Sequence, residues 1–379
     1  MKSERGQSTP PPAPDWPRVR RVLLARLRSI GDTVLMTPCL EAVKSWRPDI
    51  ETAVLSEPLS APLLEDHPLV DKLIVVDSSL SARARLVARL RKEKCDVAFN
   101  LHGGTTAMIL TALSGARHTI GYGDYRLSWM LTARAPAPDV LLGRSTLHSV
   151  EQQLALLHWA GVPQTAAPPK LSLPVSAGAE ARIRERLAKE LTFSKELTFS
   201  ASGLAGADLN FALLAPAAAF ASKMWHPVGF ACVADHLLRK WGLPSVVIAG
   251  PGQESVAQEV ATAAGAKPVV MTGISLQELT ALAGLARVFV GNDSGPMHIA
   301  AARGRPIVTV FGSSNPTVWH PWTDSPYRVI APGAHGSIKA IPAGEVIAAV
   351  DEILERIANQ FTSRFEGSAD RRRAVKDRA

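Results

Sequence analysis

The feature that most constrains the fold is an alternation of short aliphatic strands and helical segments that occurs twice along the chain. The first series spans residues 19–162 and the second spans residues 208–360. Strands that alternate with helices form parallel βαβ units. The chain has 379 residues, which is more than one ordinary core accommodates. We therefore predict an α/β protein with two Rossmann-like, doubly wound domains that face each other across a cleft.

The segments outside the two series differ from them in composition. Residues 1–18 contain a Pro-rich run and no apolar stretch, so we expect a disordered N-terminal tail and no signal peptide. Residues 163–207 are rich in Pro, Ala and Ser and contain the sequence KELTFS twice in succession, as expected for a linker that tolerates insertion. Residues 361–379 are basic, and we expect a second disordered tail.

The formal net charge of +8 lies largely at the chain ends. Residues 1–20 contribute +2 and residues 362–379 contribute +3, so the body keeps about +3. Basic tails of this kind are more often solubility features than binding modules, and we predict no nucleic-acid partner. Weak attraction to an anionic membrane is compatible with them, because each Lys or Arg near such a surface contributes about 1 kcal/mol.

The cysteines and the apolar runs bear on the cellular compartment in which we expect the protein. Cys39, Cys95 and Cys232 lie far apart and form no CxxC pair, which is typical of free thiols in reducing surroundings. The longest apolar runs fall short of the roughly 18 residues that span a bilayer. We therefore expect a cytoplasmic protein.

Open parallel sheets bind ligands at the carboxyl ends of their strands, so polar residues directly after strands are the first site candidates. One cluster, RLRSIGD at residues 26–32, follows the first strand and leads into a helix. Asp32 could act as a general base toward an acceptor hydroxyl, or it could simply cap the helix. Arg26 and Arg28 could hold an acidic acceptor, or they could be solvated.

A second cluster follows the first strand of the second series. Lys223 comes after the small residues PAAAFAS at positions 216–222. Its ammonium group suits a diphosphate, since it can neutralise the charge that develops on a leaving group. The alternative is a surface lysine beside the buried Trp225.

A third cluster, NDSGPMH at residues 292–298, ends a strand and begins a helix. The free N–H groups and the positive dipole end of that helix would form an anion site. Asp293 and Ser294 could instead be only helix caps, and His298 could be an ordinary packed histidine.

Other signals are weak. Residues 250–255 approach a GxGxxG motif but lack its third glycine, and Val270 stands where the ribose-binding acid belongs. The sequence has no Walker A motif, no HExxH motif and no plausible zinc cluster. We predict neither a dinucleotide cofactor nor a metal ion.

Taken together and in this order, the clusters resemble glycosyltransferase family 9, the ADP-heptose:lipopolysaccharide heptosyltransferases. The likeness covers roughly residues 19–358. The stretches that carry it are SIGD (29–32) with Pro38, SKMW (222–225) with Pro227, and NDSGPMH (292–298) with AAA (300–302). The resemblance implies a GT-B fold in which the N-terminal half binds the acceptor and the C-terminal half binds the nucleotide sugar.

The resemblance also implies roles for individual residues. Asp32 would be the catalytic base, and Lys223 would bind the donor phosphate. The donor site would further include Glu254, Asp293, Ser294, Gly295 and His298. We add Arg26, Arg28 and His102 as acceptor-binding candidates, with a plain turn as the alternative for the loop of His102.

The implied activity is inverting, metal-independent transfer of heptose from ADP-heptose to a lipopolysaccharide inner-core or lipid A–Kdo acceptor. No cofactor is expected beyond the donor substrate. We expect a monomer in peripheral contact with the inner membrane. The alternatives are another nucleotide sugar or glycan acceptor, or a catalytically silent nucleotide-sugar-binding protein. One departure concerns the donor: Ala217-Ala218-Ala219 stand where many relatives carry a hydroxyl residue.

Overall fold

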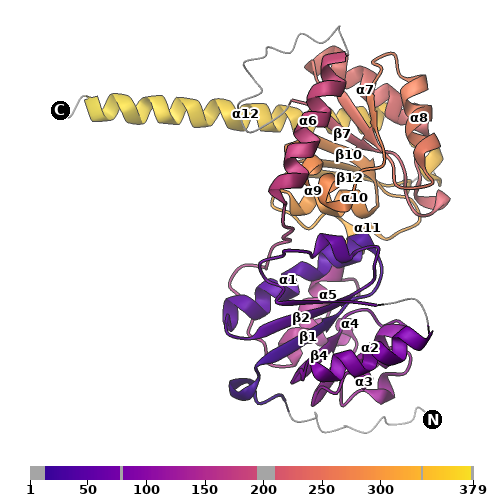
Figure 1. The fold of residues 1–379 in the computed structure, drawn as a ribbon. Helices are drawn as coiled ribbons and strands as arrows, with labels where there is room; N and C mark the ends of the chain where they lie inside the picture. Colours follow the sequence, from indigo (N-terminus) through magenta and orange to yellow (C-terminus); the bar gives the residue numbers. More distant parts are fainter. Residues whose placement is uncertain (1–12, 77–79, 194–209, 334–335, 377–379) are drawn as a thin grey trace, which may run out of the picture. The chain divides into compact units, whose positions relative to one another are not determined.

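The computed structural model describes residues 13–76, 80–193, 210–333 and 336–376, and the chain forms two compact units (Figure 1). The N-terminal unit comprises Met1–Glu180, Leu276–Thr280 and Thr317–Trp322. The C-terminal unit comprises Ala181–Ser275, Ala281–Pro316 and Thr323–Ala379. Each unit is built around one parallel sheet of six strands.

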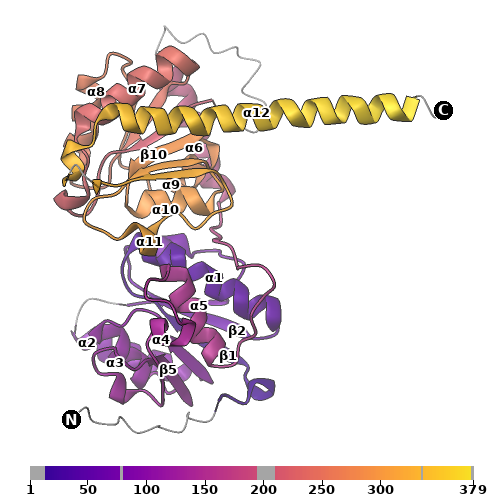
Figure 2. The same ribbon diagram turned by 180° about the vertical axis from the view of Figure 1, so that it is seen from behind.

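The sheet of the N-terminal unit has the strand order β3-β2-β1-β4-β5-β6, and every pairing is parallel. Its strands are β1 (Arg21–Ala25), β2 (Glu51–Ser56), β3 (Lys72–Val75), β4 (Val97–Asn100), β5 (His118–Tyr122) and β6 (Ala133–Ala135). The helices are α1 (Ile30–Trp46), α2 (Leu80–Lys92), α3 (Thr105–Leu113), α4 (Pro138–Leu142) and α5 (Ser149–Trp159). Helices α1 and α5 pack together on one face of the sheet, and α2 and α3 cover the other (Figure 2).

The sheet of the C-terminal unit has the order β12-β11-β10-β7-β8-β9, again with every pairing parallel. Its strands are β7 (Ala212–Ala215), β8 (Ser245–Ile248), β9 (Val269–Met271), β10 (Val288–Asn292), β11 (Ile307–Val310) and β12 (Tyr327–Ile330). The helices that follow these strands are α7 (Pro227–Trp241), α8 (Glu254–Ala263), α9 (Leu276–Leu285), α10 (Gly295–Ala302), α11 (Pro316–Trp319) and α12 (Ala343–Lys376).

The two sheets have the same topology. In each, the first strand lies at the centre and pairs with the second on one side and with the fourth on the other. This is the doubly wound order, in which the direction of the crossovers reverses at the centre and leaves a crevice at the carboxyl ends of the two central strands. The loops after β1 and β4, and after β7 and β10, are therefore where this fold binds ligands. The expected α/β architecture of two doubly wound sheets is confirmed.

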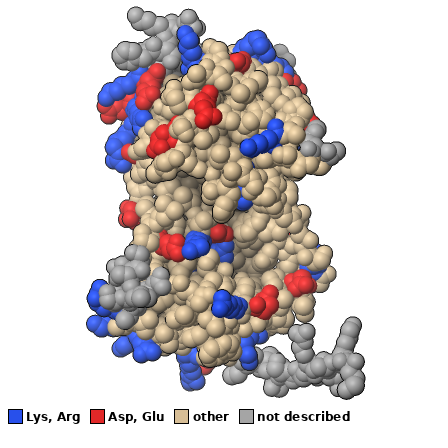
Figure 3. All heavy atoms as spheres, turned by 90° about the vertical axis from the view of Figure 1, so that its right-hand side faces the viewer, with Lys and Arg blue, Asp and Glu red and all other residues tan. Residues whose placement is uncertain are grey.

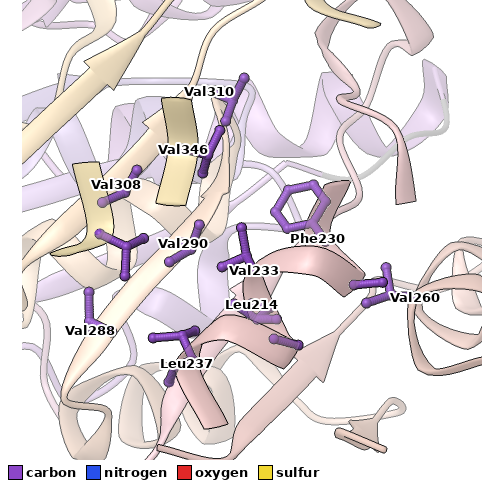
Figure 4. Close-up of a cluster of buried hydrophobic side chains, with 14 of the residues drawn as sticks. Leu214, Phe230, Val233, Leu237, Val260, Val288, Val290, Val308, Val310 and Val346 are labelled. Carbon is purple, nitrogen blue, oxygen red and sulfur yellow. The ribbon is translucent and has the colours of Figure 1, made fainter. Parts of the chain in front are cut away.

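The core of the C-terminal unit shows why these sequences form buried strands. Leu214, Val288, Val290 and Val308 come from three neighbouring strands and meet helix residues such as Phe230 in one apolar cluster (Figure 4). Parallel strands covered on both faces require such near-continuous aliphatic runs. The polar residues that follow each run then emerge together at the edge of the sheet.

Helices extend into two segments where the composition indicated irregular structure. Helix α6 (Ala177–Phe193) lies within the range 163–207 that we expected to be a linker; the second KELTFS copy, residues 195–200, lies outside the described residues. Helix α12 continues to Lys376, into the expected basic tail, where Ala, Arg and Lys are good helix formers. None of the helices in the described ranges is long and apolar enough to cross a membrane.

The N-terminal segment is packed from Trp16 onward. Trp16 is buried, and its indole Nε1 donates a hydrogen bond to the carbonyl oxygen of Ala160, 2.8 Å away. The range 1–18, which we expected to be a disordered tail, therefore ends in an ordered turn, the 3₁₀ helix η1 (Trp16–Arg18). Residues 1–12 lie outside the described part of the chain.

Substitution of a buried and of an exposed tryptophan tests the packing of the C-terminal core. Trp225 is 1% exposed and its Nε1 donates to the carbonyl oxygen of Ile341, whereas Trp129 is 71% exposed. We expect Trp225→Ala to lower the free energy of unfolding by about 3–5 kcal/mol, because it leaves a cavity and an unsatisfied carbonyl. The control Trp129→Ala should change it by less than about 0.5 kcal/mol. Urea denaturation measures both, and equal effects would contradict the packing.

Candidate active site

One cluster of candidate residues lies at the carboxyl ends of β1 and β4 and contains Arg26, Asp32 and His102. We name it the acceptor half-site, after the role that the family resemblance implies for it. These strands pair with Ala25 opposite Asn100, so the loops that follow them are adjacent. The buried Arg26 guanidinium joins the loops: its Nη2 donates to Asp32 Oδ1 and its Nη1 donates to the carbonyl oxygen of Leu101. One side chain thus fixes both the carboxylate and the strand end that precedes His102.

Asp32 has a second set of partners at the start of α1. The backbone N–H and the Oγ of Ser29 each donate to Asp32 Oδ2 at 3.0 Å. Ser29 is the N-cap of the helix, and Asp32 is its third residue and closes a capping box. Asp32 therefore does cap the helix, as one of the two interpretations proposed. The Asp32 side chain is nevertheless 20% exposed, so its carboxylate stays partly accessible.

The electrostatic surroundings keep Asp32 ionised. Burial raises the pKa of this carboxyl, but the charge of Arg26 and the hydrogen bonds from Ser29 and Arg26 outweigh burial and hold the pKa below its ordinary value. Asp32 is thus a carboxylate at neutral pH, oriented through both oxygens. A carboxylate with so low a pKa is a weak base, and it removes a proton only from a group that becomes more acidic in the transition state.

His102 stands beside this ion pair. Its backbone N–H donates to Asn100 Oδ1 at 3.0 Å, and its imidazole lies over Gly104, where a Cβ would be 2.6 Å from Nε2. Burial lowers the pKa of His102 to about 4, and the positive charge of Arg26 acts in the same direction. The imidazole is therefore neutral at pH 7. It can accept or donate a hydrogen bond without adding charge to the site.

Tyr125 completes the acceptor half-site and was missed by sequence reasoning. Its ring lies against Gly103, where a Cβ would be 2.9 Å from the ring, and Gly103 has a φ of +73° that a side chain would strain. Burial raises the pKa of Tyr125 to about 12, so the phenol stays protonated. Tyr125 follows β5, and only its position after a strand could have signalled it.

Arg28 differs from Arg26. Its side chain is 78% exposed, and its Nε lies 3.9 Å from Glu57 Oε1. The structure therefore brings Arg26, Asp32 and His102 together and places Arg28 at the solvent side of the same loop.

A second cluster of candidate residues lies at the carboxyl ends of β7 and β10 and contains Lys223 and Asp293. We name it the donor half-site, again after the role that the family resemblance implies. Lys223 Nζ and Asp293 Oδ2 form an ion pair at 2.7 Å. Asp293 is 4% exposed, and Ser314 Oγ also donates to its Oδ2. Sequence reasoning proposed Lys223 and Asp293 separately; the structure shows that they are partners.

Asn292 holds the loops of the donor half-site in register. Its Nδ2 donates to the carbonyl oxygen of Pro216 at 2.7 Å, and its Oδ1 accepts from the backbone N–H of Trp225 at 3.1 Å. The Ala-rich loop is held on its other side by Gln253, whose Nε2 donates to the carbonyl oxygen of Ala218 at 2.7 Å. Side-chain amides therefore shape a loop that has few polar side chains of its own.

A turn after β11 adds residues that the sequence did not single out. Ser222 Oγ and Ser313 Oγ are 2.9 Å apart, and a Cβ on Gly312 would lie 2.0 Å from the carbonyl oxygen of Ser222. Only glycine fits at position 312. The sequence Gly312-Ser313-Ser314, directly after a strand, was the signal that could have found this turn.

The remaining donor candidates lie on helices. Ser294 is the N-cap of α10, Gly295 is its first residue, and His298 is buried one turn further along. Glu254 is the exposed first residue of α8, after β8. Helix α10 begins directly after β10, so its free N–H groups lie at the same strand end as Asp293.

The low pKa of His102 predicts how stability depends on pH. In the unfolded chain this imidazole takes up a proton near its ordinary pKa of 6.5, and in the folded chain only near 4. The folded state is therefore favoured above the unfolded pKa and loses stability as the pH falls between these values. We expect His102→Gln to flatten this part of the profile. Urea denaturation at several pH values measures it; an unchanged slope would contradict the assigned surroundings.

Comparison with known proteins places the chain in a family. The family model described as glycosyltransferase family 9 (heptosyltransferase) matches residues 83–339. Lipopolysaccharide heptosyltransferase 3 of Escherichia coli is 27% identical in an alignment 351 positions long that covers 86% of this chain and 97% of that protein.

Solved structures that share the fold include the following two. The glycosyl transferase family 9 protein of Veillonella parvula superposes with a TM-score of 0.76 at 24% identity, covering 89% of this chain and 98% of its own. The ADP-heptose lps heptosyltransferase II of Escherichia coli superposes with a TM-score of 0.72 at 21% identity, covering 89% of this chain and 99% of its own. The family model covers more than half of the sequence, and this chain therefore belongs to glycosyltransferase family 9 and is a glycosyltransferase with the GT-B fold.

Proposed function

We propose that this enzyme transfers heptose from ADP-heptose to a lipopolysaccharide inner-core acceptor, with inversion at the anomeric carbon and without a metal ion. The observation that carries the proposal is the pair of charged half-sites: an oriented carboxylate, Asp32, after β1, and an ammonium group, Lys223, after β7. The names of the related proteins, a lipopolysaccharide heptosyltransferase and an ADP-heptose lps heptosyltransferase, support this choice of donor and acceptor.

In the acceptor half-site, the hydroxyl of the acceptor donates its hydrogen bond to Asp32. As the hydroxyl oxygen forms a bond to the anomeric carbon, its proton passes to the carboxylate. Arg26 serves as a positioning residue, since it fixes the Asp32 carboxylate and the loop of His102 together. At pH 7 the imidazole of His102 is neutral and the phenol of Tyr125 keeps its proton. Both side chains supply hydrogen bonds to the acceptor sugar.

In the donor half-site, the bond between the anomeric carbon and the diphosphate oxygen breaks, and ADP leaves with the bonding electrons. Lys223, with its side chain 25% exposed, neutralises the charge that develops on this oxygen. The N-terminus of α10, from Ser294 and Gly295, adds backbone N–H donors for the diphosphate. Glu254 holds the ribose of the nucleotide.

We propose that one cation, Lys223, and the dipole of α10 take the place of a metal ion in the donor half-site. We assign charge neutralisation at the diphosphate to Lys223 and to the N-terminus of α10. We further propose that the protein is a cytoplasmic monomer that meets its lipid-linked acceptor at the inner membrane.

Replacement of the proposed base gives the sharpest test. We expect Asp32→Asn to lower kcat about 10²–10⁴-fold, the range that general-base catalysis contributes, with little change in ADP binding. The assay measures ADP release from ADP-heptose with a delipidated inner-core acceptor, and calorimetry measures ADP binding.

Asp139→Asn, a change at an exposed carboxylate of the same unit, is the matched control and should keep wild-type turnover. Wild-type turnover in Asp32→Asn would remove the proposed base. If the wild-type chain bound nucleotide but showed no turnover, a catalytically silent binding protein would be favoured instead. If another nucleotide sugar were turned over and ADP-heptose were not, the proposed donor would be wrong.

The proposed role of Lys223 predicts a different kinetic pattern. Lys223→Met should weaken ADP binding and lower kcat/KM about 10²–10³-fold, because the leaving diphosphate loses its cation. Since the change also leaves the buried Asp293 without its cation, the double variant Lys223→Met with Asp293→Asn separates phosphate binding from this structural cost.

Lys267→Met, at an exposed lysine of the same unit, is the control and should keep wild-type kinetics. Restored ADP affinity in the double variant would show that Lys223 acts through Asp293 and would overturn its contact with the diphosphate.

A further inference from the structure

Helix α3 presents an apolar stripe to solvent. Its buried side is formed by residues such as Met108 and Leu110, and its outer side carries Thr105, Ile109 and Leu113 at a spacing of four residues. Ile109 is 36% exposed and Leu113 is 37% exposed. A spacing of four places these side chains one above another along the helix.

The stripe continues onto a neighbouring element. Helix α3 packs against the 3₁₀ helix η3 (Ser128–Met130), whose central residue, Trp129, is 71% exposed. Ile109, Leu113 and Trp129 are three of the seven large apolar side chains that lie exposed among the described residues. We call these three side chains the α3–η3 surface. Their clustering on two packed elements distinguishes them from the single exposed apolar residues found on every protein.

Basic side chains are frequent on the elements that carry and adjoin this surface. Arg91, in the last turn of α2, donates from Nε to the carbonyl oxygen of Leu113 at 3.1 Å, so a guanidinium stands at the end of the stripe. Arg117 follows α3, and Arg126 precedes Trp129 by three residues. Other exposed cations of α2 and the turn after it are Arg85, Arg89, Lys92 and Lys94.

Acidic side chains are fewer on the same elements. Glu93 is occupied by Arg21 and Lys72, at 3.8 and 3.5 Å, which leaves the exposed Asp124 as the acid nearest in sequence to Arg126 and Trp129. In Figure 3, Lys and Arg side chains gather along the lower edge of the N-terminal unit.

We propose that the α3–η3 surface docks this enzyme on an anionic lipid bilayer. Trp129 enters the interfacial layer, where tryptophan is favoured, Ile109 and Leu113 bury beside it, and the surrounding arginines meet lipid phosphates. A second copy of the chain is a poor occupant, because a symmetric dimer would bring the two basic rims together. The inference rests on the proposed function in one respect: an acceptor anchored in lipid must be met at a membrane.

The position of α3 connects the docking surface to the acceptor half-site. The helix begins at Thr105, directly after the loop of His102, Gly103 and Gly104 that lies beside Arg26 and Asp32. Nine residues of helix span about 13 Å, so the outer stripe of α3 begins within this distance, measured along the helix, of the loop at its N-terminus. A bilayer on that face holds a membrane-anchored acceptor within reach of Asp32.

Vesicle flotation of the full chain tests the proposal without donor or acceptor, so its outcome does not depend on which sugar is transferred. The probes are vesicles of pure phosphatidylcholine and vesicles with about 30% phosphatidylglycerol, because the proposal requires anionic lipid. We expect binding to the anionic vesicles and at least about tenfold weaker binding to the neutral ones.

Trp129→Ser should weaken binding to the anionic vesicles about tenfold, since it removes the largest apolar side chain of the surface. Val228→Ser is the matched control: Val228 is 59% exposed on the C-terminal unit, and this change should leave binding unaltered. Arg117→Gln combined with Arg126→Gln should weaken binding more than about tenfold, because both arginines lose their attraction to anionic lipid.

The basic chain termini stay intact in all these variants. If they alone bound the vesicles, Trp129→Ser would bind as the wild type does, and the proposal would be overturned. Loss of dimer on size-exclusion chromatography in Trp129→Ser, without a change in flotation, would likewise overturn it in favour of self-association. Unchanged thermal unfolding and unchanged turnover on a delipidated acceptor show that each variant is folded.

Discussion

Parallel pairing in both sheets is the constraint on which the rest of the structure depends. A parallel strand can be followed by its neighbour only through a crossover, so every loop that follows a strand emerges at the same edge of the sheet. Arg26, Asp32 and His102 meet at that edge of one sheet, and Lys223 and Asp293 meet at that edge of the other. The reversal of strand order at β1 and at β7 then separates the neighbouring loops and leaves room for a ligand.

Each half-site contains a carboxylate held by a cation. Asp32 is paired with Arg26, and Asp293 is paired with Lys223; in each pair at least one member is almost completely buried. Removing one partner from such a pair leaves a charge uncompensated, so these residues are expected to be intolerant of substitution for structural as well as chemical reasons.

Helix α3 has two faces with different partners. Its inner side belongs to the same apolar cluster as β1 and α2, while its first residue follows the His102 loop and its outer stripe lies open between arginines. A nine-residue helix can serve both purposes because buried and exposed positions alternate every three to four residues. The His102 loop and the proposed lipid contact are thereby joined by one secondary-structure element.

The sequence by itself determined the fold class and the edge of each sheet where chemistry is concentrated. The pattern along the chain is local: an aliphatic run is followed by small and polar residues and then by a helix. This pattern predicted the strands, the crossovers and the candidate residues after each strand. Asp32, Lys223 and Asp293 could be named in this way, although their proposed roles rest on the resemblance to a family.

Tertiary structure alone decided which of these residues are partners. The contacts of Arg26 with Leu101 and of Ser314 with Asp293 depend on which strands lie side by side, and residues 26 and 101 are 75 positions apart. Tyr125 against Gly103 and the exposed Trp129 beside α3 could not be read from the sequence for the same reason. Periodicity reports the conformation of a segment, whereas burial and charge pairing are set by segments that are distant in the chain.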